Sequence, residues 1–188
     1  RDAVVTAGLP EREHVRGNRA ADVRVVLYSD TECPFCNSFY DYSIPKIMDA
    51  YGSRVALVYR HYPIVSLHPN ARIEADATEC AYEQGGQKGF WDLLHALYTE
   101  IDVENTFDIT RIPELARDVG LDPSRLQSCM NSGKGDEWVK KNMAEATSVG
   151  VYKTPTVYVE NIHTGKSVLI AGSGFTATKA AIELLLRQ

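Results

Sequence analysis

The sequence predicts an α/β protein whose mixed core of strands and helices is interrupted by an all-helical insertion. Three observations predict this fold class. Residues 23–62 have the patterns of a strand, a helix and a strand, residues 69–149 have helical patterns only, and residues 155–188 have the patterns of two strands and a helix. Strands favour β-branched or alternating runs, whereas helices repeat apolar residues every three or four positions. Each switch between these patterns therefore marks a boundary.

The first half of the core is built around a strand that is expected to be buried. The run VRVVLYS at 23–29 is mostly β-branched and apolar, which is typical of a strand covered on both faces. Residues 37–51 carry apolar side chains at helical spacing, with Pro45 expected to kink the helix and Gly52 expected to end it. The run RVALVYRHY at 54–62 predicts the second strand.

The central block has the start and stop signals of consecutive helices. Glycines and an Asp-Pro start separate the helices expected over 70–84, 90–101, 110–119, 122–133 and 136–149. After that, runs at 155–160 and 166–172 predict a β-hairpin, and 177–188 predicts an amphipathic helix. We therefore divide the chain into a polar lead-in at 1–22, a core at 23–63 and 150–188, and a helical insertion at 64–149.

Charge and hydropathy narrow the range of functions. The chain has 188 residues and a net charge of −5, which argues against a surface for nucleic acid or anionic membranes. No apolar run approaches the ~18 residues that a membrane span needs, and residues 1–13 lack the apolar region of a signal peptide. Because the chain begins with Arg1 rather than Met, we expect a mature or trimmed form whose export signal or anchor lies outside this sequence.

Cys33 and Cys36 are the strongest chemical signal in the sequence. They flank Pro34 and Phe35 at the point where the first strand gives way to a helix. A thiolate at a helix start is stabilised by unpaired N–H groups and by the helix dipole, and residues one turn apart lie on the same side. The motif therefore predicts a dithiol that cycles with a disulfide, in which Cys33 is the nucleophile and Cys36 the resolving thiol.

Other interpretations of the pair stay open at this point. A zinc site would need two further ligands at matching spacing, and the sequence has no second Cys-x-x-Cys motif. A Cu(I)-binding metallochaperone would need only soft thiolates, which the pair supplies. An inert bridge is disfavoured, because closing so short a loop gains little chain entropy. We expect no resident metal and no cofactor.

A second signal lies where a strand of the core begins again. Thr154-Pro155 comes at the start of the run TVYVE, a position where a strand tolerates proline. Bonds that precede proline are the ones that adopt the cis form, and a cis bond here would leave neighbouring backbone groups free to pair with an extended substrate. An ordinary trans proline at a strand edge is the alternative.

With these motifs in this order, the sequence resembles the DsbA-like branch of the thioredoxin superfamily. The resemblance extends from about Val15 to the C-terminus and rests on CPFC, on TPT at 154–156, on the helical insertion and on segments such as VYRHYP, LHPNA and TECAYEQGG. It implies a thioredoxin fold in which Cys33 attacks, Cys36 resolves and a cis-Pro155 lies opposite. It also implies that Pro34 and Phe35 tune the redox potential, while Thr154 and Pro155 contact substrate.

The same resemblance implies a thiol–disulfide oxidoreductase, and we expect an exported oxidase that introduces disulfides into folding proteins. Only about twenty residues precede the first strand, too few for the dimerisation domain of related isomerases, so we expect a monomer. A reductase or isomerase of the same fold is the alternative within this class. The expected partners are unfolded or reduced exported proteins and a membrane redox protein that recycles the dithiol. The expected location is extracytoplasmic: periplasmic, secreted or membrane-tethered.

One position departs from the pattern of many relatives. They carry a buried acid six residues before the first cysteine, where this chain has Leu27. Asp30 and Glu32 lie nearby, but the alternation of the strand makes neither equivalent to that acid. If the acid normally relays a proton for the resolving thiol, this chain must use water or another group.

Cys80 and Cys129 lie on apolar helical stripes inside the insertion. Cys80 shares its stripe with Ala77, and Cys129 shares its stripe with Leu126 and Met130. Two buried thiols or a disulfide between two helices would both fit this placement. The even cysteine count and the expected export favour the disulfide.

Five residues at strand ends and in the motif complete the predictions. Arg60 and His61 end the second strand and are interpreted as solvated, with a position that borders the active face as the alternative. Tyr28, Phe35 and Tyr62 are expected to form an apolar rim around the cysteines, suited to binding unfolded chains.

Overall fold

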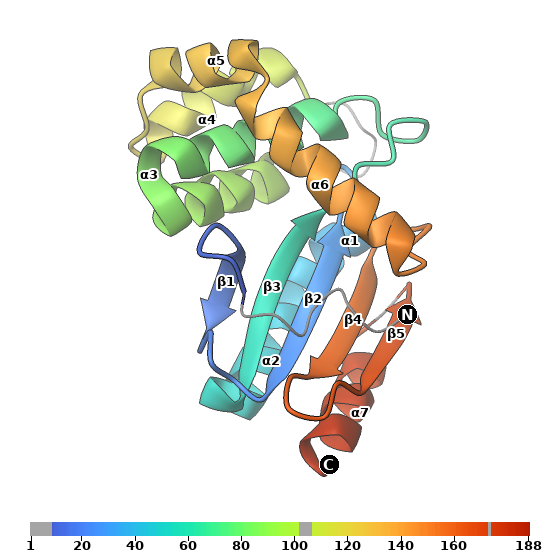
Figure 1. Cartoon of the computed structure of the whole chain (residues 1–188). Helices are drawn as coiled ribbons and strands as arrows, with labels where there is room; N and C mark the ends of the chain where they lie inside the picture. Colours follow the sequence, from blue (N-terminus) through green and yellow to red (C-terminus); the bar gives the residue numbers. More distant parts are fainter. Residues whose placement is uncertain (1–8, 102–106, 173) are drawn as a thin grey trace. The chain divides into compact units, whose positions relative to one another are not determined.

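The computed structural model describes residues 9–101, 107–172 and 174–188 (Figure 1). The chain forms two compact units. The first contains residues up to Ser29, Phe35–Arg60 and Glu145–Gln188, and the second contains Asp30–Pro34 and His61–Ala144. The expected insertion at 64–149 and the second unit thus differ by a few residues at each end. The short segment Asp30–Pro34 also belongs with the second unit.

A single sheet with the order β1-β3-β2-β4-β5 forms the first unit's frame. Its strands are β1 (His14–Gly17), β2 (Val23–Ser29), β3 (Val55–His61), β4 (Thr156–Asn161) and β5 (Ser167–Ala171). The central strand β2 is buried along its whole length, as predicted, and pairs antiparallel with β4. β4 pairs antiparallel with β5 across the expected hairpin. The arrows of β2 and β3 point the same way in Figure 1, so the sheet is mixed.

β1 lies within the segment that was expected to be a polar lead-in. His14–Gly17 pairs antiparallel with β3 and places Val15 opposite Val58. The strand has four residues at the edge of the sheet, which is too short for an alternating pattern to stand out among polar neighbours. The lead-in prediction was therefore wrong for these residues.

A helical stretch with a widened turn leads away from the CPFC motif. It consists of α1 (Pro34–Ser38), the π-helical turn η1 (Phe39–Ser43) and α2 (Ile44–Tyr51). Pro45, the second residue of α2, has no N–H to donate to the preceding turn, so the π-turn that ends at Ser43 is the local form of the expected kink. Gly52, with φ of 54°, ends α2 as predicted and begins the 3₁₀ turn η2 (Gly52–Arg54).

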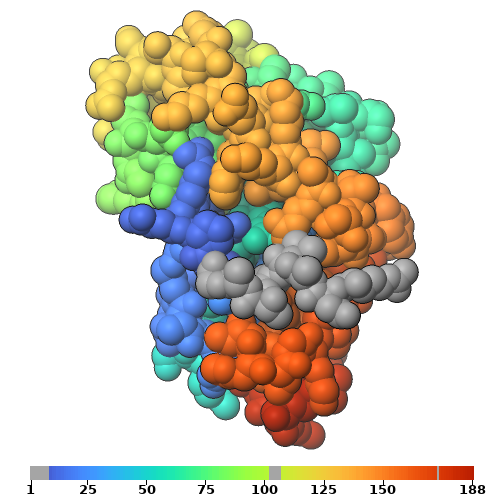
Figure 2. Space-filling model, viewed as in Figure 1, coloured from blue at the N-terminus to red at the C-terminus, as the bar shows by residue number. Residues whose placement is uncertain are grey.

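The C-terminal helix α7 (Phe175–Leu186) completes the first unit. It contacts β2, β4 and β5 as well as α2, and Figure 1 draws both helices on one face of the sheet. In the space-filling view the β4–β5 hairpin and α7 form one continuous body (Figure 2). The unit's core therefore lies between the sheet and these helices.

Helices make up the second unit. They are α3 (Ala71–Glu100), the 3₁₀ turn η3 (Ile109–Arg111), α4 (Ile112–Asp118), α5 (Pro123–Ser132) and most of α6 (Lys134–Ser148). α3 bends at Gly86, whose φ is 61°, where the sequence predicts one helix to end before another begins. α3, α4 and α5 pack around an apolar core that includes Leu93, Leu97 and Leu126. Among the residues that the structure describes, no helix is both long and apolar enough to cross a membrane.

Candidate active site

The two cysteines of the CPFC motif lie at the start of α1. Cys33 directly precedes Pro34, the first residue of the helix, and Cys36 is its third residue. Cys33 is 4% exposed, Cys36 is 0% exposed, and neither takes part in a disulfide in this structure. Phe35, which lies between them, is 73% exposed. Across 9–101, 107–172 and 174–188, no group of three or more His, Cys, Asp or Glu residues is arranged to hold a metal ion.

The turn that leads into Cys33 is held by the Asp30 carboxylate. The Cys33 N–H donates to the Asp30 carbonyl oxygen over 3.2 Å, which closes the turn. The Asp30 carboxylate accepts the N–H of Glu32 over 3.0 Å and the N–H of Ile64 over 2.7 Å. It also lies 2.8 Å from Nδ1 of the buried His68, a contact that sequence reasoning did not find. The position of Cys33 is thus fixed by contacts on both sides of the turn.

Two further acids tie the same turn to the first turns of α3. Glu32 Oε2 accepts the N–H groups of Asn70 and Ala71 over 2.8 and 2.9 Å, where the helix dipole favours a negative charge. The Thr31 hydroxyl donates to Glu74 Oε2 over 2.5 Å. Glu74 is 0% exposed, and burial raises the pKa of its carboxyl to about 8, although the Thr31 hydrogen bond acts in the opposite direction. Glu74 therefore holds a proton at neutral pH.

An apolar pocket of about 500 Å³ opens beside Phe35 in the first unit. Its wall is formed by the α1–η1 helical stretch, by the segment that precedes β4 and by the connection from β5 to α7. Phe35, Thr154 and Pro155 all line it, so residues about 120 positions apart in the sequence come together. The Thr154–Pro155 peptide bond is cis, as the sequence predicts. Apolar pockets of this size are typical of ligand-binding sites.

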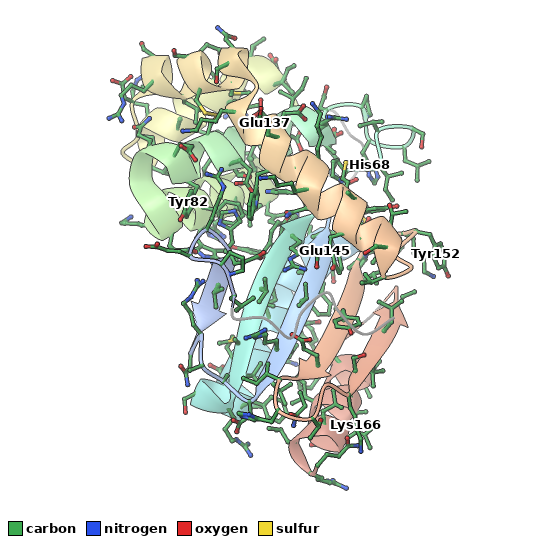
Figure 3. All side chains as sticks on the ribbon, in the orientation of Figure 1. His68, Tyr82, Glu137, Glu145, Tyr152 and Lys166 are labelled. Carbon is green, nitrogen blue, oxygen red and sulfur yellow. A yellow bond between two sulfur atoms is a disulfide. The ribbon has the colours of Figure 1, made fainter. Side chains whose placement is uncertain are left out.

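Arg60 is buried and paired, whereas the sequence interpretation was a solvated strand end. Its guanidinium donates to both carboxylate oxygens of Glu13, over 3.2 and 3.0 Å, and also to Glu145. Figure 3 labels Glu145 near the C-terminal end of α6. The guanidinium also lies 3.3 Å from the Tyr28 hydroxyl. Tyr28 is 1% exposed, so the prediction that it forms an apolar rim was wrong, and burial raises its pKa to about 12.

His61 is likewise buried rather than solvated. Its Nε2 atom lies 3.1 Å from the Thr78 hydroxyl and 3.4 Å from a carboxylate oxygen of Glu79. The backbone N–H of His61 donates to the Asn142 side chain over 3.0 Å. These partners lie far from His61 in sequence, which is why a strand-end pattern could not reveal them.

Cys80 and Cys129 form a disulfide between α3 and α5, which is the pairing favoured by the cysteine count. Their sulfur atoms are 2.06 Å apart. Cys80 is 1% exposed, whereas Cys129 is half-buried and packs at the margin of the second unit's core. The bridge closes a long loop within the second unit and takes no part in the CPFC motif.

Comparisons with known proteins identify the family. A family model described as thioredoxin matches residues 10–170, so the chain belongs to the thioredoxin family. The chain is similar to the crystal structure of Pseudomonas aeruginosa DsbA2. The match covers 95% of this chain and 96% of DsbA2, with 29% sequence identity and a TM-score of 0.76. The structure of oxidised BdbD from Bacillus subtilis covers 95% of both chains at 22% identity, with a TM-score of 0.81. The fold is therefore the thioredoxin fold with a large helical segment, as in DsbA structures.

Curated relatives share a segment of similar length. The Na(+)/H(+) antiporter NhaA 3 of Salinispora tropica is 34% identical over 150 residues, which is 80% of this chain and 22% of the antiporter. The chain thus spans about a fifth to a quarter of the length of the curated relatives that it matches.

Proposed function

We propose that the chain is an exported thiol–disulfide oxidoreductase that acts mainly as an oxidase of folding proteins. The observation that carries this proposal is the CPFC pair at the start of α1 in a chain of the thioredoxin family. The pocket supports it, because Phe35 of the motif and the cis-Pro155 segment form parts of one apolar wall. A reduced, unfolded segment would place an apolar side chain there while its cysteine reacts.

In the proposed cycle, the oxidised Cys33–Cys36 pair accepts two electrons from a substrate dithiol. A substrate thiolate attacks Cys33 Sγ, the Cys33–Cys36 bond breaks, and its electron pair passes to Cys36 Sγ. The second substrate thiolate then attacks the substrate sulfur of the mixed disulfide and releases Cys33 as a thiolate. The substrate gains a disulfide, the pair is reduced, and the two substrate protons pass to Cys36 and to solvent. A membrane redox partner would then reoxidise the pair.

The Cys80–Cys129 disulfide supports an extracytoplasmic location. Structural disulfides persist in oxidising compartments and are rare where the cytosolic thiol pool keeps cysteines reduced. A bridge that joins two helices of the second unit is therefore expected in a chain that is exported. The reduced proteins that the chain meets there would be its substrates.

The reduction potential of the Cys33–Cys36 pair tests the direction of electron flow. Equilibration in glutathione buffers, with Cys33→Ser as the control, is expected to give a value near that of strong disulfide donors, about −120 mV. A value near about −270 mV would make the protein a reductase and overturn the oxidase assignment. If the pair does not equilibrate with glutathione at all, the thiol–disulfide assignment itself is wrong.

Trapping the mixed disulfide tests the roles of the two cysteines. A Cys36→Ser variant, built on a Cys80→Ala/Cys129→Ala background, should retain a covalent adduct with an unfolded protein that carries an activated disulfide. The matched Cys33→Ser variant on the same background should form no adduct. The reverse pattern would assign the nucleophile to Cys36 and contradict the proposed cycle.

A further inference from the structure

Two lysines lie at the apolar pocket and give it a local charge opposite to that of the chain. The chain has a net charge of −5. Lys153 lines the pocket beside Thr154, and a Cβ placed on Gly172, another lining residue, would lie 3.2 Å from Lys153 Nζ. The Lys153 side chain is exposed, and its ammonium group lies against Gly172 at the wall of the pocket.

Lys46 approaches the same pocket from α2. Its Nζ atom lies 3.7 Å from the ring centroid of Tyr42 and 5.7 Å from that of Phe175. Both rings line the pocket, and Tyr42 is 58% exposed. Contact with an aromatic face holds an ammonium group by attraction to the ring's negative quadrupole. The rings thus present the Lys46 charge at the margin of the pocket.

Neither lysine has an acidic partner among the residues that the structure describes. Lys179, on α7 of the same unit, lies 3.7 Å from Glu183, but no ion pair of this kind involves Lys46 or Lys153. The described residues that line the pocket also include no Asp or Glu. Two cations without a carboxylate therefore flank an aromatic pocket, and a bound segment with negative charge would complement them.

From this arrangement we propose that Lys46 and Lys153 select acidic substrates. The preferred substrate is a reduced, extended protein segment in which an apolar residue near the reacting cysteine has Asp or Glu beside it. The apolar side chain fills the pocket between Phe35, Tyr42 and Phe175, and the carboxylates contact the two ammonium groups. This proposal rests on the proposed function and adds a substrate class to it. A partner with basic residues at the same positions would be disfavoured by like-charge contact.

The test compares oxidation of three reduced dithiol peptides by the oxidised protein. The peptides are identical except that the residues beside one leucine near a cysteine are Glu, Gln or Lys. Two exposed ion pairs should make kcat/KM for the Glu peptide about tenfold higher than for the Gln peptide, chiefly through a lower KM. The Lys peptide should have a kcat/KM below that of the Gln peptide. The preference should shrink at 0.5 M salt, because the screening length between exposed charges falls from about 10 Å at 0.1 M salt to about 3 Å at 1 M.

Variants assign the preference to the two lysines. Within K46Q/K153Q, the ratio of kcat/KM between the Glu and Gln peptides should fall to near one. K166Q is the matched control, because Lys166 lies beyond the far end of β4 from Pro155, in the turn that leads into β5 (Figure 3). Its ratio should match that of the unaltered protein. Equal rates for the Glu and Gln peptides, or a preference that survives in K46Q/K153Q, would overturn the proposal.

Oxidation of dithiothreitol separates this proposal from the one on which it rests. This small dithiol is uncharged and does not need the pocket. If the unaltered protein oxidises dithiothreitol but shows no preference among the peptides, only the substrate class is wrong. If it oxidises neither, the proposed function fails as well.

Discussion

Replacing Glu74 by Gln should change how the stability of the protein depends on pH. Glu74 is fully buried, and burial raises its pKa from 4.5 to about 8. In the unfolded chain the carboxyl ionises above pH 4.5, whereas in the fold it stays protonated until pH 8. Stability from this group is therefore fully present below pH 4.5 and is lost as pH rises toward 8. At about 1.4 kcal/mol for each pKa unit, the complete loss would approach 5 kcal/mol as an upper bound.

The E74Q variant removes this titration and keeps the hydrogen bond. The Gln carbonyl oxygen can accept the Thr31 hydroxyl that Glu74 accepts now. We expect E74Q and the unaltered protein to be similarly stable at pH 4.5, and E74Q to be more stable by about 3 kcal/mol at pH 7. Asp30 and Glu32, the acids near Glu74, are present in both proteins.

Urea unfolding at pH 4.5, 6, 7 and 8 measures this difference directly. Both proteins should carry Cys33→Ser and Cys36→Ser, so that thiol ionisation does not contribute. The control is E137Q, the same chemical change at an exposed position of α6 (Figure 3). It should leave the pH profile of the unaltered protein in place. If the free energies of unfolding of E74Q and the unaltered protein differ by a constant amount from pH 4.5 to 8, Glu74 is not a buried acid with a raised pKa.

Two further changes probe the buried contacts of each unit. Arg60→Met should lower the free energy of unfolding by about 3–5 kcal/mol, because it removes the guanidinium that pairs with the buried Glu13 carboxylate. A double variant with Glu13→Gln should recover part of this loss in urea unfolding, and no recovery would contradict the pairing. Cys80→Ala/Cys129→Ala should cost up to about 4 kcal/mol, since the bridge closes a sequence separation of 49 residues. Thermal unfolding that is unaffected by this pair of changes would show that the disulfide does not stabilise the second unit.

The elements that sequence reasoning located well are those defined by local signals. Asp122 caps α5 through two hydrogen bonds from the next backbone N–H groups, and Gly133 ends the helix in the left-handed conformation. Pro45 was expected to kink its helix and lies two residues after the end of a π-turn. A cap, a kink or a glycine stop involves residues a few positions apart, so the sequence contains the whole interaction.

The contacts that sequence reasoning missed join residues far apart in the chain. Arg60 pairs with Glu13, 47 positions away, and with Glu145, 85 positions away. Thr31 and Glu74 are 43 positions apart. No periodicity records such pairs, because the register of the sheet and the packing of α3 bring them together. The sequence motifs predict roles for Cys33, Cys36 and Pro155, whereas the pocket-lining positions of Tyr42, Lys153 and Phe175 became visible only in the fold.

The chain has no acid at position 27, but it has acidic residues in the turn before Cys33. Leu27 is 0% exposed and lies opposite Val157 in the sheet, so an acid there would be surrounded by apolar side chains. Asp30 and Glu32 each accept two backbone N–H groups.

Glu74 differs from those two acids in the kind of partner that it has. It accepts a side-chain hydroxyl rather than backbone N–H groups, and its Oε1 atom, like Oε1 of Glu32, has no hydrogen-bond partner among the described residues. Ionising all three acids would gather three negative charges at the turn that ends in Cys33, which would oppose formation of a thiolate there. Because burial raises the pKa of Glu74 to about 8, its carboxyl keeps a proton at neutral pH. A protonated carboxyl, contributed by Glu74 of α3, therefore lies beside the turn that leads into Cys33, whereas the central strand has Leu27.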